Sequence, residues 1–225
     1  MKSLGIIMDW SEVWAPLIPL LYFLFNRQQP RYLKPVIVYL FMALFINLVG
    51  DIIGDFKARL PQWMQSNNPL YNIHSIIRFI CFISFFKGLG HNDFMKIRNI
   101  LLVLSTGGLI INFVFVEDFF NPDHFSGNLL SAEAYILLIF CLLYYLSKLR
   151  SSERSITSGP DFWVVTGLSI YVVVNFIVFL FYVPMIKQDP FLAEAIWNIH
   201  NMAYIILCIF ITKALYVSAR HQHAN

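Results

Sequence analysis

Seven long apolar segments constrain this chain more than any other feature. A bilayer core about 30 Å thick takes about 20 residues of helix. The predicted spans cover residues 12–25, 33–53, 70–86, 97–116, 128–149, 162–183 and 192–217. Charged residues make up only 13% of the chain, against about 25% in a soluble domain. We therefore predict an all-α polytopic membrane protein with seven transmembrane helices in the lipid bilayer, forming one domain over residues 1–225.

Basic residues near the ends of these segments predict the orientation. Eleven of the 16 Lys and Arg residues fall in loops that share one side, four fall on the opposite side, and Arg78 lies inside the third segment. Cytoplasmic loops are rich in Lys and Arg, so we expect the N-terminus outside and the C-terminus in the cytoplasm. The predicted location is the cytoplasmic (inner) membrane of a bacterium. A net charge of +3 requires no nucleic-acid partner.

A short polar motif occurs twice. Tyr71-Asn72-Ile73-His74 opens the third segment, and Trp197-Asn198-Ile199-His200 opens the seventh, 126 positions later. Glu12 in the first segment and Glu133 in the fifth are 121 positions apart. Polar side chains in hydrocarbon are costly unless they find partners, so matching pairs of them favour two halves built alike.

Asn47 and Asn175, 128 positions apart, extend the pattern to the second and sixth segments. We interpret residues 4–90 and 127–217 as parallel repeat halves joined by a connector helix, 97–116, in a 3+1+3 arrangement. Such a repeat has a pseudo-twofold axis along the membrane normal. The alternative is chance matching between leucine-rich helices.

The 3+1+3 layout resembles that of SWEET-type sugar transporters, and microbial rhodopsins share the seven-span topology with the N-terminus outside. The resemblance is one of topology, because the Pro-Gln signature of the SWEET family is absent. A retinal protein would need a lysine midway along the seventh segment, whereas Lys213 lies near its cytoplasmic end. No specific family is identified from these residues.

Polar residues gather in the half of each segment that this orientation places outside, while the inner halves are almost wholly apolar. Polar chemistry at membrane depth is tolerated where it lines a cavity. We therefore predict a polar cavity open to the outside above an apolar plug. The residues expected in it are His74, His200, Asn72, Asn198, Glu12, Glu133, Asn47, Asn175, Asp51 and Arg78.

Arg78 needs an acidic partner in hydrocarbon, and either Asp51 or a cavity glutamate is expected. The pair would either serve the cavity or simply pin two helices together. His74 and His200 have three interpretations: structural hydrogen-bonding residues, a ligand or proton site, or metal or haem ligands. In the last, His74, His200, Glu12 and Glu133 could satisfy zinc, although no His-Glu-x-x-His signature is present.

These features predict a receptor-like or sensor-like membrane protein that binds a small molecule, an ion or a proton from outside and acts on a cytoplasmic signalling partner. The first alternative is a small-solute transporter. The second is an intramembrane metal-dependent hydrolase, and enzyme activity is the less expected outcome. The residues name no cofactor. If the halves are equivalent, His74→Ala and His200→Ala should have similar effects.

Overall fold

The computed structural model describes residues 2–61, 65–90, 126–150 and 159–223, with isolated residues between 99 and 108. This part of the chain is all-α, with no strand in it. Two 3₁₀ turns, Arg31–Leu33 and Lys57–Arg59, flank α3. The helices are α1 (Lys2–Asp9), α2 (Ser11–Phe25), α3 (Lys34–Phe56), α4 (Asn68–Gly88), α6 (Gly127–Arg150), α7 (Pro160–Gln188) and α8 (Pro190–His223).

Five of these helical stretches are long and apolar enough to cross a membrane. They are Arg31–Arg59, Asn68–Gly88, Gly127–Arg150, Pro160–Tyr182 and Phe191–His221. The apolar helix α2 has 15 residues, which at 1.5 Å per residue is about 22 Å, less than a bilayer core of about 30 Å. Six of the seven predicted segments therefore coincide with helices. The predicted connector, 97–116, lies almost wholly outside the described residues.

Helix starts follow the local chemistry of the chain. Proline occupies an early position in α3, α4 and α7, where its missing N–H costs no helical hydrogen bond. The turn between α7 and α8 is the sequence Asp189-Pro190. The Asp189 carboxylate accepts hydrogen bonds from the backbone N–H groups of Phe191 and Leu192, both at 3.1 Å. This N-cap starts α8 at once, so α7 and α8 form a tight helical hairpin.

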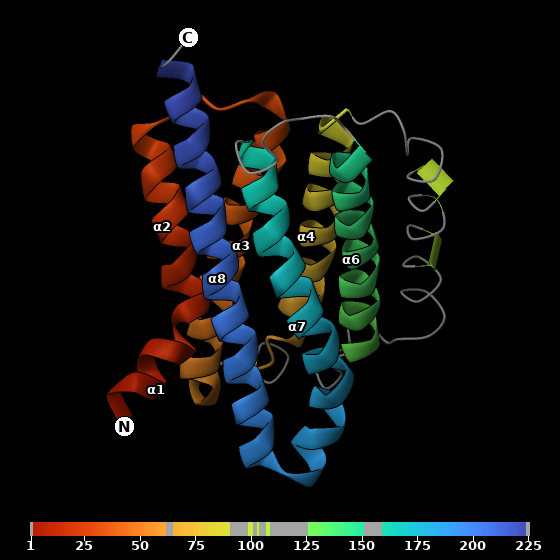
Figure 1. Ribbon diagram of the computed structural model, residues 1–225. Coiled ribbons are helices and arrows are strands. Elements are labelled where there is room, and N and C mark those ends of the chain that lie inside the picture. Colours follow the sequence, from red (N-terminus) through yellow and green to blue (C-terminus); the bar gives the residue numbers. More distant parts are fainter. Residues whose placement is uncertain are drawn as a thin grey trace.

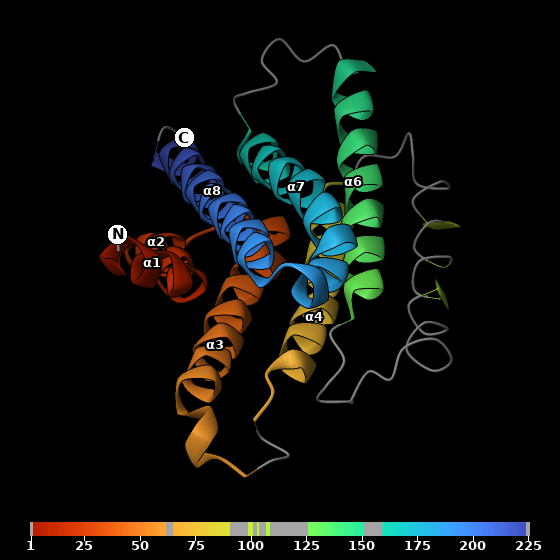
Figure 2. The same ribbon diagram turned by 90° about the horizontal axis from the view of Figure 1, so that it is seen from below.

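The six longer helices form a ring in chain order. Neighbours pack as α2–α3, α3–α4, α4–α6, α6–α7 and α7–α8, and α8 packs against α2 to close the ring. Figure 2 shows these helices from below, with α2 beside α8 and α6 beside α4 and α7. Helices α4 and α6 run in the same direction (Figure 1).

Helices α7 and α8 make the closest contact in the ring. A Cβ added at Gly167 would lie 2.5 Å from the Cβ of Phe210 and 3.5 Å from the Cα of Leu207. Only glycine allows the two backbones to approach this closely. Their connection extends beyond the ends of α4 and α6 (Figure 1), and we call this end of the bundle the hairpin end.

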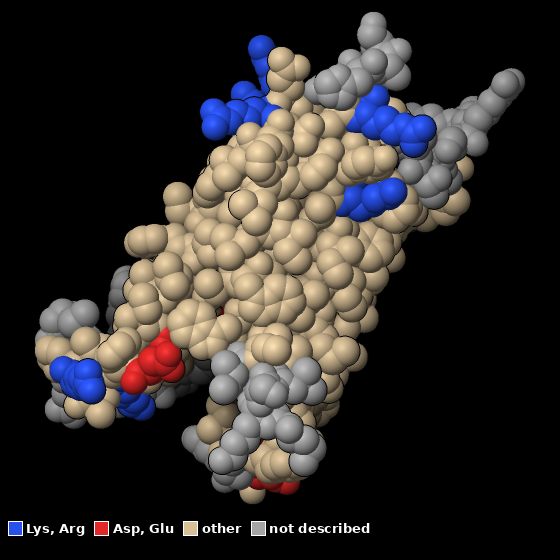
Figure 3. Space-filling view, turned by 90° about the vertical axis from the view of Figure 1, so that its left-hand side faces the viewer, with Lys and Arg blue, Asp and Glu red and all other residues tan. Residues whose placement is uncertain are grey.

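The opposite end, which holds the C-terminus, is called here the basic end. Figure 3 shows Lys and Arg side chains there, a broad uncharged band below them, and charges of both signs at the hairpin end. Among the described residues, the exposed basic side chains of this end are Arg27, Arg31, Lys34, Lys87, Arg150, Lys213 and Arg220. Large apolar side chains are exposed around the band, as in Phe25, Phe45 and Leu149, which is the surface that lipid would cover.

Candidate functional site

The seam between α4 and α6 is joined by a buried ion pair. Arg78 donates from Nε to Glu133 Oε1 at 2.7 Å and from Nη2 to Oε2 at 2.6 Å. The Ser75 hydroxyl, one turn earlier on α4, also donates to Glu133 Oε2. Both charged side chains are almost fully buried. Of the two partners expected for Arg78, the structure therefore shows a glutamate and not Asp51.

Tyr171 on α7 extends this ion pair toward the rest of the bundle. Its hydroxyl accepts a hydrogen bond from Arg78 Nη1 at 2.6 Å. Its backbone carbonyl accepts one from the amide nitrogen of Asn175 at 2.8 Å. Its ring also packs against that of His200, with centroids 5.9 Å apart. Tyr171 thus contacts both the Arg78–Glu133 ion pair and His200.

The seam between α2 and α8 is joined by His200 and Glu12. His200 Nε2 lies 2.8 Å from Glu12 Oε1, and both side chains are buried. His200 Nδ1 is hydrogen-bonded to Asn175 Oδ1. Because the Asn175 amide nitrogen already donates to a carbonyl, its oxygen must accept here, so Nδ1 carries a proton. One further proton then lies between Nε2 and the carboxylate, either on the imidazole or on Glu12.

Glu12 is itself held by residues from three other elements. Its second oxygen, Oε2, accepts a hydrogen bond from the Tyr71 hydroxyl at 3.3 Å. Its backbone carbonyl accepts one from the Asn47 amide at 3.0 Å. The Asn201 amide similarly donates to the Met8 carbonyl at 3.1 Å. Two asparagines therefore anchor the turn that joins α1 to α2 and aim Glu12 at His200.

His74 has different surroundings from those of its repeat partner. Its ring stacks on Tyr39, with centroids 5.7 Å apart and planes 11° from parallel. Within the described chain, His74 Nε2 has no hydrogen-bond partner. His200, in contrast, is bonded at both nitrogens. The surroundings of the two histidines therefore differ, and similar effects of His74→Ala and His200→Ala stay a prediction.

The other predicted residues lie around this core. Asn72 is fully buried on α4, whereas Asn198 and Asp51 are partly exposed. The two motif turns do meet, since the rings of Tyr71 and Trp197 are in edge-to-face contact at 5.6 Å. The first residue of each copy thus forms the contact between them.

The four proposed metal ligands do not come together. Among the described residues, no group of three or more His, Cys, Asp or Glu side chains could hold a metal ion. Arg78 and Ser75 occupy the oxygens of Glu133, and the ring of His74 faces Tyr39. Only the pair of His200 and Glu12 remains of that set, which does not provide the three protein ligands usual for catalytic zinc.

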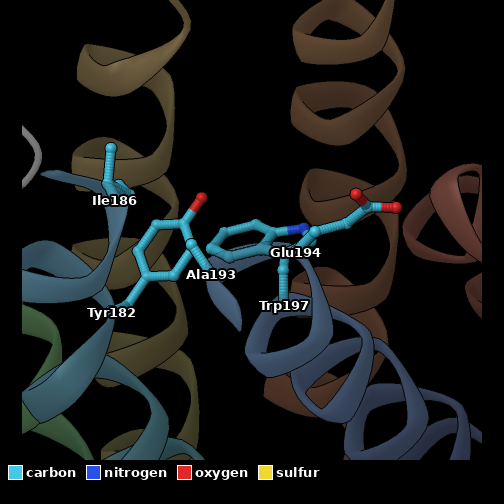
Figure 4. A pocket seen from close by; sticks show the side chains of 5 residues that line it. All are labelled: Tyr182, Ile186, Ala193, Glu194 and Trp197. Atoms are coloured by element: carbon cyan, nitrogen blue, oxygen red, sulfur yellow. The ribbon is translucent and has the colours of Figure 1, made fainter. Parts of the chain in front are cut away.

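A pocket of about 310 Å³ lies at the hairpin end. Figure 4 shows the rings of Tyr182 and Trp197 beside each other in it, with the Glu194 carboxylate directed away from Tyr182. The residues that line it are Tyr182, Ile186, Ala193, Glu194 and Trp197. The Trp197 ring also contacts the His200 ring, with centroids 4.9 Å apart. None of the ten predicted cavity residues is among the described residues that line this pocket.

Several residues of this site were not predicted from the sequence. Tyr171 precedes Asn175 by four positions, so both lie on the same face of α7. Ser75 precedes Arg78 by three positions, so these two share a face of α4. Tyr71 and Trp197 stood inside the repeated motif, which indicated that aromatic rings accompany the histidines. Tyr182 and Glu194 carried no such signal, since only the α7–α8 hairpin brings them together.

No family model, curated protein or solved structure matches this chain. The arrangement of its own residues must therefore carry the functional argument.

Proposed function

We propose that this protein is a membrane sensor, in which a small solute or a proton acting at the hairpin end alters the polar network inside the bundle. The observation that carries this proposal is an unbroken series of contacts. It runs from the pocket through Trp197 to His200, and from His200 through Tyr171 to Arg78. Through these contacts, a change at the pocket wall would reach Arg78 at the α4–α6 seam.

The His200–Glu12 pair is the element that can change state. The proton between His200 Nε2 and the Glu12 carboxylate can lie on either group, whereas the Arg78 guanidinium keeps its protons. A ligand that shifts Trp197 changes the packing on the imidazole and with it the hydrogen bond to Glu12.

Helix α8 supplies the route for output. It carries Glu194 and Trp197 at the pocket, His200 in the core and Arg220 at the basic end. With 34 residues it is about 51 Å long at 1.5 Å per residue, which exceeds a bilayer core of about 30 Å. If the basic end faces the cytoplasm, the last turns of α8 would present the signal to a cytoplasmic partner.

Transport is the second candidate. The two halves meet at two seams, α4–α6 and α8–α2, and rocking about such seams is how many repeat transporters alternate access. Next to the network on its basic side, Phe82, Leu137 and Leu207 are fully buried. This apolar layer in α4, α6 and α8 favours the sensor, because a polar solute would have to cross it.

Ligand screening followed by hydrogen exchange tests the sensor. Solutes that raise the melting temperature of the purified protein would be added to wild type and to Tyr171→Phe, and amide exchange followed in each helix. We expect the ligand to change exchange in α8, α2 and α6 of wild type, and the change in α6 to be lost in Tyr171→Phe. Exchange altered at the pocket alone, or counterflow of the labelled solute in vesicles, would overturn the sensor in favour of a simple binding site or a transporter.

A further inference from the structure

The pocket at the hairpin end has the size of a site for one small molecule. Its volume of about 310 Å³ is at the lower end of the range for small-molecule sites, about 300–1,000 Å³. Its walls come from the last turns of α7 and the first turns of α8 (Figure 4). A compact solute fits such a space, and a polymer or peptide does not.

Two aromatic rings form a large part of the wall, and they are held in place. The Trp197 and Tyr182 rings have centroids 4.9 Å apart. Tyr71 meets the Trp197 ring edge-to-face at 5.6 Å, and His200 contacts it at 4.9 Å. Three rings from α4, α7 and α8 therefore support the indole. The face of an aromatic ring is its negative region and attracts cations.

The charged residue at the pocket is negative, as are the faces of the aromatic rings. Glu194 is the charged residue among the described residues that line it. A second carboxylate, that of Glu12, lies behind the aromatic wall and is bonded to the Tyr71 hydroxyl at 3.3 Å. The remaining lining side chains, Ile186 and Ala193, are apolar. Aromatic faces, a carboxylate and small apolar groups together match an ammonium that carries methyl or methylene groups.

We propose that this pocket binds a small organic cation, an ammonium group held against the Trp197 and Tyr182 rings, with the exposed carboxylate of Glu194 at the rim adding a longer-range attraction. This inference rests on the proposed function and names the ligand class that the sensor would read. An anion would meet the carboxylate of Glu194 and the negative faces of the rings. A neutral solute of the same shape would lose the attraction to the ring faces and to Glu194.

Choline and its neutral carbon isostere, 3,3-dimethylbutan-1-ol, test the proposal. Binding to the full chain in nonionic detergent would be measured by isothermal titration calorimetry. We expect saturable binding of choline, and binding of the isostere at least about tenfold weaker, since the two differ only in charge. No saturable choline binding, or equal affinity for both, would overturn the cation site.

Two variants assign the binding to the pocket. Glu194→Gln keeps size and exposure, so the fold is preserved, and should weaken choline about tenfold while leaving the isostere unchanged. Trp197→Leu removes the ring face and should abolish detectable binding. The matched controls are Asp55→Asn and Trp10→Leu, an exposed acid and an exposed indole away from the pocket lining. Choline affinity that is unchanged in Glu194→Gln, or reduced equally in Asp55→Asn, would contradict the assignment.

An ammonium could reach the pocket as a free solute or as a lipid headgroup. Choline titrations would be repeated in nanodiscs of phosphatidylglycerol alone and of phosphatidylglycerol mixed with phosphatidylcholine. Weaker choline binding in the mixed discs assigns the site to the headgroup, and unchanged binding assigns it to a free solute. Either result supports recognition of the ammonium.

The ligand class and the sensor can fail separately. A neutral solute that alters hydrogen exchange in α8 and α6, in a protein that ignores choline, would refute the cation and retain the sensor. Labelled choline that binds at the pocket and also crosses the membrane would retain the cation and refute the sensor.

Discussion

The two seams of the helix ring place a glutamate from the start of one half against a side chain from the end of the other. At α4–α6, Glu133 meets the guanidinium of Arg78. At α2–α8, Glu12 meets the imidazole of His200. Their partners differ in kind, since one is a guanidinium bound through two nitrogens and the other is an imidazole that shares one proton with the carboxylate.

This difference separates the tasks of the two seams. A bidentate pair of permanent charges with a third hydrogen bond from Tyr171 is rigid and holds α4, α6 and α7 together. A carboxylate and an imidazole that share one proton can exist in more than one arrangement, and this seam is the one that borders the pocket through Trp197. The α4–α6 seam is thus the anchor of the bundle, and the α2–α8 seam is the part suited to respond.

Removing the anchor should have the largest effect. Arg78→Met leaves the Glu133 carboxylate buried without its cation, which costs about 3–5 kcal/mol of unfolding free energy. The measurement is unfolding in mixed micelles titrated with a denaturing detergent. The double variant Arg78→Met with Glu133→Met should recover most of the loss, because no buried charge then remains. If the two single losses simply add, the pair is not coupled and the anchor assignment is wrong.

Substituting the two histidines one at a time should show that His200 contributes more to stability than His74. His200→Phe keeps a ring in place but leaves Glu12 and Asn175 without their partner, and we expect a loss of about 2–3 kcal/mol. His74→Phe keeps the stack on Tyr39 and removes a nitrogen that has no partner, so its effect should stay within about 1 kcal/mol. Each variant serves as the control for the other in the same unfolding assay. Equal losses would restore the symmetric interpretation of the two motifs.

A smaller effect than the loss of Arg78 or His200 is expected at Tyr171, the residue that joins the two seams. Tyr171→Phe removes one hydrogen bond to the Arg78 guanidinium and keeps the ring against His200, which should cost about 1–2 kcal/mol. Tyr135→Phe, at a side chain exposed on the outer surface, is the matched control and should leave stability unchanged. A Tyr171→Phe protein as stable as this control would show that the network is not continuous through Tyr171.

Sequence reasoning went furthest where one physical rule acts alone. The predicted spans 70–86 and 162–183 fall inside α4 and α7, and the span 33–53 begins one residue before α3. The reason is that the length of an apolar run and the prolines at its start depend only on the chain itself. It also selected the charged and imidazole residues of the network, since such a group in an apolar run must find a partner, but not Tyr171 or Ser75. It could not choose among partners. Asp51 or a cavity glutamate was expected for Arg78, and only helix packing places Glu133 in reach.

By itself, therefore, the sequence determined an all-helical chain with segments long and apolar enough to cross a membrane, and the set of polar residues that must be satisfied within them. The tertiary structure alone decided the pairing: which carboxylate meets the guanidinium, which histidine is bonded at both nitrogens, and where the pocket lies. The physical reason is that hydrophobic burial is a local property of each helix. Hydrogen bonds and ion pairs between helices depend instead on side-chain positions within a few tenths of an ångström, and these follow from how close contacts such as that at Gly167 set one helix against the next.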